Sequence, residues 1–217
     1  IEPTELSDRL LEMYSDRILC PHFHMSIQSA NTDVLSKMKR SYGQAGVISS
    51  LEKIADRVPG AFIGMDLIAG FPTETIEQFE DSYKVLTQTP WTRIHVFPYS
   101  KRNGTKAASL NESVPQSQKM DRAQKLRELS LHRYQSEAMK QIESKKQVLV
   151  LKKIGRRINE RPHGLSRDYW PVEIQEFDHP DKFIGKEIEI QIKEYVHNPQ
   201  RMEGHFSGER INDKNNF

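Results

Sequence analysis

Cysteine is almost absent from this 217-residue sequence, since Cys20 is the only one. A single thiol excludes an internal disulfide framework, and it excludes an iron–sulfur cluster or a cysteine-based zinc site built by this chain alone. This usage fits a reducing, cytoplasmic location. No apolar run approaches the roughly 20 residues of a membrane span, and the first residues lack the basic and apolar regions of a signal peptide.

The sequence also lacks an initiator methionine and a strong net charge. It begins with Ile1-Glu2-Pro3, so we expect the chain to start inside a longer protein, unless processing removed a methionine. Lysine and arginine (32) nearly balance aspartate and glutamate (30), and the formal net charge of +2 says little about partners. Any nucleic-acid site must therefore come from local clusters of charge. The length favours two modules.

The first hundred residues alternate short apolar runs with amphipathic stretches, which is typical of βα units in a parallel sheet. Strands are predicted at Phe23–Ile27, Phe62–Ala69 and Arg93–Phe97. Helices are predicted at Thr32–Lys39, Gln44–Val58 and from Thr75 to about Thr87. Asn31 or Thr32 is the expected N-cap of the first helix, and Thr75 to Gln78 has the spacing of a capping box. Three such units cannot close a barrel, because they leave an edge strand.

The second half changes from loop to helix and then to strands. Lys101–Val114 is predicted to be a loop, and Pro115 opens a helix expected to end near Glu143. The apolar stripe of this helix comprises Met120, Ala123, Leu126, Leu129, Tyr134, Ala138 and Ile142. From Gln147 a two-residue period predicts strands around 148–151 and 188–192, with Tyr169–Ile174 as a middle strand and Asp178–Lys182 as a loop. The predicted domains are residues 1–114 (α/β), 115–145 (linking helix), 146–198 (small β domain) and 199–217 (polar tail).

The first predicted strand is polar on one side only. A two-residue period places His22, His24, Ser26 and Gln28 on one face and apolar residues on the other. Asp66 and His95 stand in the next two strands, so all of these side chains converge if the apolar face packs against helices. One interpretation is a metal-dependent hydrolase that uses His22, His24, Asp66 and His95. The other is that these groups hydrogen-bond one another in a wet core.

The segment Gly70-Phe71-Pro72-Thr73-Glu74-Thr75 joins the second strand to a helix. A glycine at the end of a strand lets the backbone approach a ligand, and the N-terminus of a helix follows at once. This arrangement suits a nucleotide-like cofactor. The alternative is an ordinary tight βα turn.

Read together, several segments resemble the radical S-adenosylmethionine (SAM) methylthiotransferases. They are Ile1-Glu2-Pro3, Cys20-Pro21-His22-Phe23-His24 with Gln28-Ser29, Val34-Leu35 with Met38, Arg40 and Tyr42, Asp66–Thr75, and His95–Ser100 with Gly104-Thr105. The resemblance covers nearly the whole chain. Within the family it is most similar to the threonylcarbamoyladenosine tRNA methylthiotransferases, on the strength of Cys20-Pro21-His22 and Gly164–Val172. The departures are Ser26, Ala30, Gly43 and Thr73, where the family usually has Pro, Gly, Thr and Gly.

The resemblance implies an α/β fold: the C-terminal half of a partial six-stranded (β/α) TIM-like radical-SAM barrel, then a long helix and a small all-β barrel similar to the RNA-binding TRAM domain. It implies SAM and [4Fe-4S] clusters as cofactors of the complete enzyme. The upstream Cys-x-x-x-Cys-x-x-Cys motif and the N-terminal domain with the second cluster have no counterpart here, so we expect no activity from the chain alone. The implied cofactor-binding residues are Gln28, Ser29, Arg40, Asp66, Gly70 and Tyr99.

Basic residues of the β domain are the predicted RNA-binding set. Arg156, Arg157 and Arg167 lie near Tyr169 and Trp170, which combines phosphate-binding cations with stacking surfaces. A tRNA anticodon stem-loop is the expected partner, and the expected reaction adds a methylthio group to C2 of N6-threonylcarbamoyladenosine. The alternatives within the family act on isopentenyl-adenosine or on a ribosomal-protein aspartate. A cluster-free RNA-binding module, or a merely solvated basic loop, also fits these residues.

Overall fold

The computed structural model describes residues 1–15, 18–110, 114–152, 162–175, 180–198 and 203–211. The chain divides into two compact units, unit 1 (Ile1–Tyr134) and unit 2 (Gln135–Phe217), and each is described by itself. Within the described ranges, no helix combines the length and the apolar character that crossing a membrane requires.

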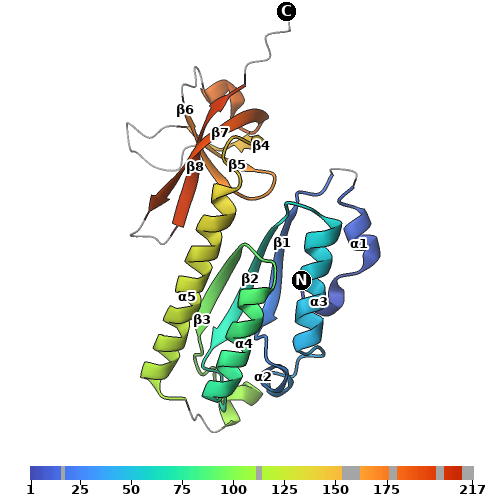
Figure 1. Ribbon diagram of the computed structural model, residues 1–217, viewed down its shortest axis with the longest axis vertical. Coiled ribbons are helices and arrows are strands. Elements are labelled where there is room, and N and C mark those ends of the chain that lie inside the picture. The colour runs from blue at the N-terminus through green and yellow to red at the C-terminus, as the bar shows by residue number, and fades with distance from the viewer. Residues whose placement is uncertain (16–17, 111–113, 153–161, 176–179, 199–202, 212–217) are drawn as a thin grey trace, which may run out of the picture. The chain divides into compact units, whose positions relative to one another are not determined.

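Unit 1 is built on a parallel sheet with the strand order β1-β2-β3 (Figure 1). The strands are β1 (His22–Gln28), β2 (Phe62–Ala69) and β3 (Arg93–Pro98), so all three predicted strands are confirmed to within one residue at each end. The helical elements are η1 (Pro3–Glu5), α1 (Asp8–Glu12), α2 (Thr32–Lys37), α3 (Gln44–Arg57), α4 (Ile76–Gln88), η2 (Lys106–Ser109) and α5 (Gln116–Met139). The sequence pattern predicts neither α1 nor η2, and η2 lies in a segment predicted to be a loop.

Alternate residues of the sheet point to one apolar face that helices cover. These residues include Phe23, Met25 and Ile27 of β1 and Ile63, Met65 and Leu67 of β2, and each is at most 3% exposed. They form one buried cluster with apolar residues of α3 and α4, which lie on the same face of the sheet in Figure 1. Burying a large apolar side chain contributes about 1.5–3 kcal/mol. This face therefore supplies most of the driving force for folding unit 1.

Both edge strands of the sheet bond to other segments of unit 1. At β3, the Ser130 hydroxyl accepts from the Ile94 N–H at 2.9 Å and donates to the Ile94 carbonyl at 3.1 Å. At β1, the Ile1 amino group donates to the His24 carbonyl at 2.7 Å, and the Ser26 N–H donates to the Ile1 carbonyl at 2.9 Å. These bonds satisfy backbone groups that an edge strand would otherwise leave open.

The helix starts follow the predicted caps. The Asn31 side chain accepts from the N–H groups of Asp33 and Val34, so Asn31 is the N-cap of α2. Thr75 and Gln78 form the reciprocal capping box of α4. Both predictions are confirmed, because a capping side chain satisfies N–H groups that the first helical turn cannot bond internally.

Unit 2 contains a closed barrel with the strand order β4-β5-β6-β8-β7. Its elements are β4 (Lys145–Val150), β5 (His163–Ser166), β6 (Pro171–Gln175), η3 (Pro180–Phe183), β7 (Glu187–Asn198) and β8 (Glu203–Arg210). The inward residues of β4 and β7 alternate as predicted: Val148, Val150, Ile190 and Ile192 are at most 1% exposed. Closure pairs the strands on both sides, which removes open edges.

The assignment of residues 199–217 to a polar tail is wrong for 203–210, which form β8. Phe206 of this strand is fully buried, with ring centroids 5.2 Å from Trp170 and 5.9 Å from Tyr195. The strand shows no apolar alternation, because Gly204 and Gly208 occupy positions where a Cβ atom would collide with Tyr195 and with β7 backbone. Glycine is required there by close packing rather than by a turn.

Other boundaries differ by a few residues. Helix α5 ends at Met139 rather than near Glu143, and Met120, which helical spacing places in the apolar stripe, is 45% exposed. Tyr169 has φ 71° and belongs to the turn before β6 rather than to a strand. The two-residue period does not indicate the short strand β5, in which Gly164 approaches the Leu149 carbonyl too closely for any side chain.

Phe206→Ala should destabilise unit 2 by about 3–5 kcal/mol, because it leaves a cavity between Trp170 and Tyr195. Urea unfolding followed by Trp170 fluorescence in a Trp91→Phe background measures this, since the chain has two tryptophans, one in each unit. Val196→Ala, at a 36% exposed position of β7, is the control and should cost less than about 1 kcal/mol. Equal effects of the two changes would contradict the placement of β8 in the core.

Candidate functional site

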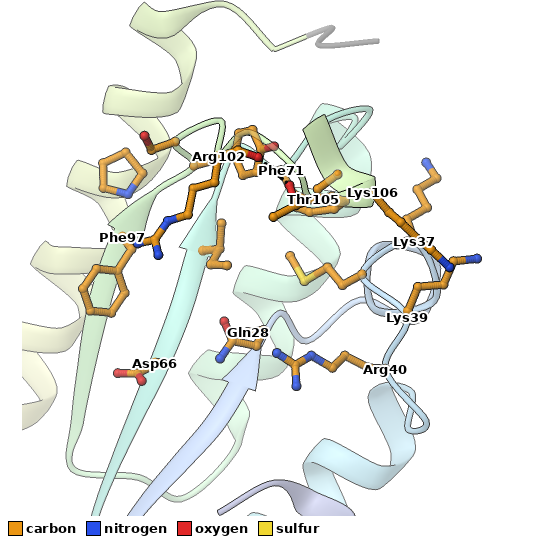
Figure 2. A pocket seen from close by; sticks show the side chains of 16 residues that line it. Gln28, Lys37, Lys39, Arg40, Asp66, Phe71, Phe97, Arg102, Thr105 and Lys106 are labelled. Atoms are coloured by element: carbon orange, nitrogen blue, oxygen red, sulfur yellow. Dashed lines mark hydrogen bonds between the residues drawn. The ribbon is translucent and has the colours of Figure 1, made fainter. Parts of the chain in front are cut away.

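A cavity of about 670 Å³ opens at the carboxyl ends of the three parallel strands (Figure 2). Four of the predicted cofactor-binding residues line it: Gln28, Arg40, Asp66 and Tyr99. Ligands of open α/β sheets bind at this end of the strands, because the loops there diverge and leave a crevice. The cavity is therefore the candidate functional site of unit 1.

Gln28 ends β1 with a left-handed backbone (φ 66°), where the pairing with β2 changes register after Met25. A non-glycine residue in this conformation costs on the order of 1 kcal/mol or more. The Tyr42 hydroxyl holds this end of the strand by donating to the Ser26 carbonyl at 2.8 Å. Burial raises the pKa of Tyr42 to about 12, so the hydroxyl stays protonated as a donor. Figure 2 shows Gln28 between Asp66 and Arg40.

Aromatic side chains form part of the lining. Phe71 and Tyr99 pack edge to face with ring centroids 5.5 Å apart. The Tyr99 hydroxyl oxygen is buried and has no hydrogen-bond partner among the described residues. A buried polar atom without a partner costs about 1–3 kcal/mol. A polar ligand group that bonds this hydroxyl would remove that penalty.

Gly70 does not line the cavity, but it anchors the loop that carries Phe71. It has φ 73°, and a Cβ atom there would collide with the Lys119 side chain. Its N–H donates to Glu74 Oε2 at 2.9 Å, and Arg122 Nη1 donates to the same oxygen at 2.7 Å. Burial raises the pKa of Glu74, and its bonds to Arg122 and to the Gly70 N–H oppose that rise. The buried ion pair thus fixes the start of this loop.

Ser29 also lies outside the lining. It is 2% exposed, and its hydroxyl accepts from the Asn31 N–H at 3.2 Å. The adjoining Ala30 N–H donates to the Ser82 hydroxyl at 2.9 Å. Ser29 therefore shapes the turn between β1 and α2 and makes no direct contact with the cavity.

Arg40 lines the cavity and forms an ion pair with Glu2 of the same chain. Within unit 1, the guanidinium of Arg40 thus already has a carboxylate partner. Both side chains are about one-third exposed, at 28% and 33%, so solvent screens the pair and a ligand can compete for Arg40.

His22, His24, Asp66 and His95 share the face of the sheet opposite the helices. His24 Nε2 lies 2.9 Å from Asp66 Oδ1, and the rings of His24 and His95 have centroids 5.4 Å apart. Burial, with the charges of His24 and His95, lowers the pKa of His22 to about 4. Among the described residues, no three His, Cys, Asp or Glu side chains are placed to hold one metal ion. The geometry therefore offers the metallohydrolase alternative no ligand set.

The predicted RNA-binding residues are only partly described. Arg156 and Arg157 lie outside the described residues. Arg167 Nη1 lies 3.4 Å from Glu187 Oε2, and Tyr169 is 48% exposed in the turn before β6. Trp170 is 3% exposed, so its interpretation as a stacking surface is wrong and it belongs to the barrel core.

Some cavity residues escaped the sequence analysis. Lys37, Lys39, Phe97, Arg102 and Lys106 also line the cavity. Lys37 and Lys39 follow β1, whereas Arg102 and Lys106 follow β3, at the end of the sheet where ligands bind. Position just after a predicted strand is thus the signal that would have found them.

Comparisons with known proteins agree with this architecture. Residues 1–86 match the Radical SAM superfamily. The chain is 44% identical over 130 residues to threonylcarbamoyladenosine tRNA methylthiotransferase MtaB of Rickettsia prowazekii, covering 59% of this chain and 30% of that protein. It is 34% identical over 169 residues to tRNA-2-methylthio-N(6)-dimethylallyladenosine synthase of Rhodococcus jostii, covering 76% of this chain and 34% of that protein. The chain is a relative of the radical SAM methylthiotransferases.

The similarity to these methylthiotransferases reaches beyond the sheet. The tRNA-2-methylthio-N(6)-dimethylallyladenosine synthase of Oceanobacillus iheyensis is 31% identical over 193 residues, covering 88% of this chain and 36% of that protein. A match of this extent must include part of unit 2. The chain spans about a third of the length of these methylthiotransferases.

His22→Gln should flatten the acid side of the stability curve. The pKa of His22 falls from an ordinary 6.5 to about 4 on folding, so the unfolded chain binds the proton more tightly. The stability from neutral His22 is complete above pH 6.5 and is lost as the pH falls toward 4. Because the side chain is only half-buried, we expect a loss on the order of 1 kcal/mol. Urea unfolding of unit 1 between pH 7 and about 4 measures it.

The matched control is His132→Gln, which makes the same substitution at an exposed position of α5. A wild-type curve that coincides with that of His22→Gln over this pH window would show that His22 does not titrate between these limits.

Thr73→Gly should stabilise unit 1 by about 1 kcal/mol. Thr73 has φ 69°, which is unfavourable for a β-branched residue, and its buried hydroxyl has no hydrogen-bond partner among the described residues. Glycine relieves both penalties and loses part of the gain to its freedom in the unfolded chain. Thr75→Ala, two residues later, should instead lower stability by about 1 kcal/mol, because it removes the N-cap of α4. Urea unfolding separates the two outcomes, and a destabilising Thr73→Gly contradicts the strain argument.

Proposed function

We propose that the chain is part of a tRNA-modifying radical SAM methylthiotransferase, in which unit 1 forms a wall of the SAM pocket and unit 2 docks RNA. The observation that carries the proposal is the cavity at the carboxyl ends of β1, β2 and β3, because β1 and β2 lie in the segment, residues 1–86, that matches the Radical SAM superfamily. On this proposal the three strands are the last three of a partial six-stranded barrel. The barrel of unit 2 then takes the part of a TRAM-like domain.

SAM bound at a four-iron cluster supplies the radical chemistry of this superfamily. Cluster ligation requires several thiolates, and this sequence holds only Cys20. The residues present therefore do not fit the cluster, and on this proposal its ligands come from the N-terminal region of the same enzyme. The residues around the cavity do fit the rest of SAM, because they combine aromatic surface with a few polar groups.

On this proposal each lining residue makes a different contact with SAM. The Gln28 amide, which lines the cavity, would bond a ribose hydroxyl or the carboxylate of the ligand. Phe71 provides apolar surface for the adenine, and the Tyr99 hydroxyl would gain the hydrogen-bond partner that it lacks among the described residues. Asp66, held by His24, offers an acceptor for a ribose hydroxyl or an ammonium group. Ser29 and Gly70 act as positioning residues, since neither lines the cavity.

Exposed side chains of unit 2 support the proposal that it binds a tRNA anticodon stem-loop. Lys152 and Arg167 offer cations and Tyr169 offers an exposed ring, and these are the groups that bind phosphates and stack on unpaired bases. Arg156 and Arg157 stay in the proposed RNA-binding set on sequence grounds alone, because they lie outside the described residues. The names of these three relatives all refer to tRNA, which supports the same class of partner.

We propose N6-threonylcarbamoyladenosine as the modified base, which would gain a methylthio group at C2. The relatives carry names with two different bases, threonylcarbamoyladenosine and dimethylallyladenosine. Cys20-Pro21-His22 and the 44% identity over 130 residues support the first. Gly164 carries less weight as a substrate marker, because the close approach of Leu149 already requires glycine there.

A complete enzyme, made by joining a methylthiotransferase N-terminal region upstream of Ile1, should methylthiolate tRNA that bears threonylcarbamoyladenosine. Mass spectrometry of tRNA nucleosides from a strain lacking its own enzyme measures the product. The matched control is the same fusion with Gln28→Ala and Tyr99→Phe, which should lose most activity if these residues hold SAM. Product found only on isopentenyl-adenosine, or only on a ribosomal protein, would contradict the substrate and leave the reaction class standing.

A further inference from the structure

The turn between β5 and β6 carries an exposed aromatic side chain on a strained backbone. Arg167, Asp168 and Tyr169 form this three-residue hairpin loop, which closes where the Ser166 N–H donates to the Trp170 carbonyl at 2.9 Å. Tyr169 has φ 71° and is 48% exposed. Loops of this length end with a left-handed residue, and glycine is preferred there because a side chain makes that conformation unfavourable. A tyrosine at this position therefore strains the turn.

Burial in the core does not account for the tyrosine. Nearly half of its surface stays open to solvent, whereas the neighbouring Trp170 is 3% exposed and packs inside the barrel. An unfavourable backbone conformation that packing does not require is typical of a binding or active site. An exposed ring beside an arginine, here Arg167, is a surface on which an unpaired base stacks. The proposed function of unit 2 supplies such a ligand.

A buried ion pair lies against this turn. Lys146 is charged, yet it shares the inward face of β4 with Val148, and its side chain is 8% exposed. Its ammonium group donates to Asp168 Oδ2 and, at 3.0 Å, to Gln141 Oε1 in the turn that follows α5. The Asp168 side chain is 14% exposed. The central residue of the hairpin loop is thus tied to the interior of the barrel.

The carboxylate of Asp168 extends this network to the backbone on both sides of Tyr169. Its Oδ1 accepts from the Ser166 hydroxyl at 2.6 Å, and the same hydroxyl accepts from the Trp170 N–H at 2.9 Å. The Tyr169 N–H donates to the Ser166 carbonyl at 2.9 Å. A buried ion pair adds little net stability, so the geometry that it imposes on the turn is the better explanation for it.

We propose that Lys146, Asp168 and Ser166 are positioning residues, which hold Tyr169 in its left-handed conformation and so present its ring to an unpaired base of the RNA. The inference rests on the proposed function of unit 2 as an RNA-docking module. It deepens that function, because it assigns the strained turn and the inward-facing lysine to one purpose. Tyr169 contacts the base, whereas the buried groups act only through Tyr169.

Replacement of Tyr169 separates stability from RNA binding. Tyr169→Gly should raise the midpoint temperature of unfolding of unit 2 by a few degrees, because it relieves the strain of the turn. The same change should weaken binding of a labelled anticodon stem-loop RNA about tenfold, because the ring is lost, and Tyr169→Phe should keep the wild-type affinity. Fluorescence anisotropy with the full 217-residue chain measures affinity, and Trp170 fluorescence in the Trp91→Phe background measures unfolding.

The positioning role is tested by Lys146→Met with Asp168→Leu, which removes both buried charges and leaves neither of them unpaired. This paired variant should lose RNA affinity about tenfold. Adding Tyr169→Gly to it should cause no further loss, because residues that act through one side chain are not additive with it. The matched control is Lys145→Met with Glu189→Leu, which removes the exposed ion pair at the adjacent position of β4 and should change affinity less than about twofold.

Asp168→Asn gives an independent measurement with a smaller change in the core. The amide keeps an acceptor for the Ser166 hydroxyl and removes only the charge that pairs with Lys146. RNA affinity should fall in the same direction as in Tyr169→Gly, and the logarithmic salt slope should stay unchanged, because a buried lysine makes no phosphate contact.

Four outcomes would overturn the positioning role. They are a Tyr169→Gly chain that is less stable than the wild type, a folded paired variant or Asp168→Asn chain that binds RNA like the wild type, equal losses in the paired and control variants, and losses from the paired variant and Tyr169→Gly that add. Failure of the proposed function looks different, because the wild-type chain itself would then bind no anticodon stem-loop.

Discussion

The alternation of apolar and polar residues along β1 is the constraint on which the rest of unit 1 depends. Phe23, Met25 and Ile27 bury one face under α3 and α4, which commits His24 and Gln28 to the other face. A shift of one residue would exchange the faces, so the hydrophobic pattern determines the strand register and the contents of the open face together. The polar groups that face the cavity are thus a consequence of apolar packing on the opposite face of β1.

The connections at the carboxyl ends of the strands hold the least favourable groups of unit 1. Gln28 and Thr73 adopt left-handed backbone conformations, and Glu74 and Arg122 form an ion pair in which the side chains are 3% and 6% exposed. Loss of one partner of a buried pair costs about 3–5 kcal/mol, although the intact pair adds little net stability. The pair is therefore better explained by the position in which Glu74 holds the Gly70 N–H than by a gain in folding stability. Local cost is concentrated where the cavity needs a defined shape.

The strands and helix starts of unit 1 could be predicted because their determinants are local: periodicity for the strands, and a capping side chain for α2 and α4. Strand β8 could not be predicted, because Phe206 is its only buried apolar residue and its glycines are required by nearby atoms of β7. Gln28 and Tyr99, which sequence motifs single out as cofactor-binding residues, both line the cavity. Ser29 does not line the cavity, which agrees with strict alternation, because that puts Ser29 on the face opposite Gln28.

The surroundings of a charged side chain are harder to predict from sequence than apolar packing, because they depend on which segments the fold brings together. Lysines elsewhere in unit 1 have carboxylate partners, such as Asp8 for Lys53 at 2.9 Å and Glu80 for Lys125 at 3.3 Å. Lys37, Lys39, Arg102 and Lys106 of the cavity lining lack such pairs within the described residues, and repulsion among them, although screened over about 8–10 Å, slightly lowers stability. Folding therefore gives no reason for gathering these cations.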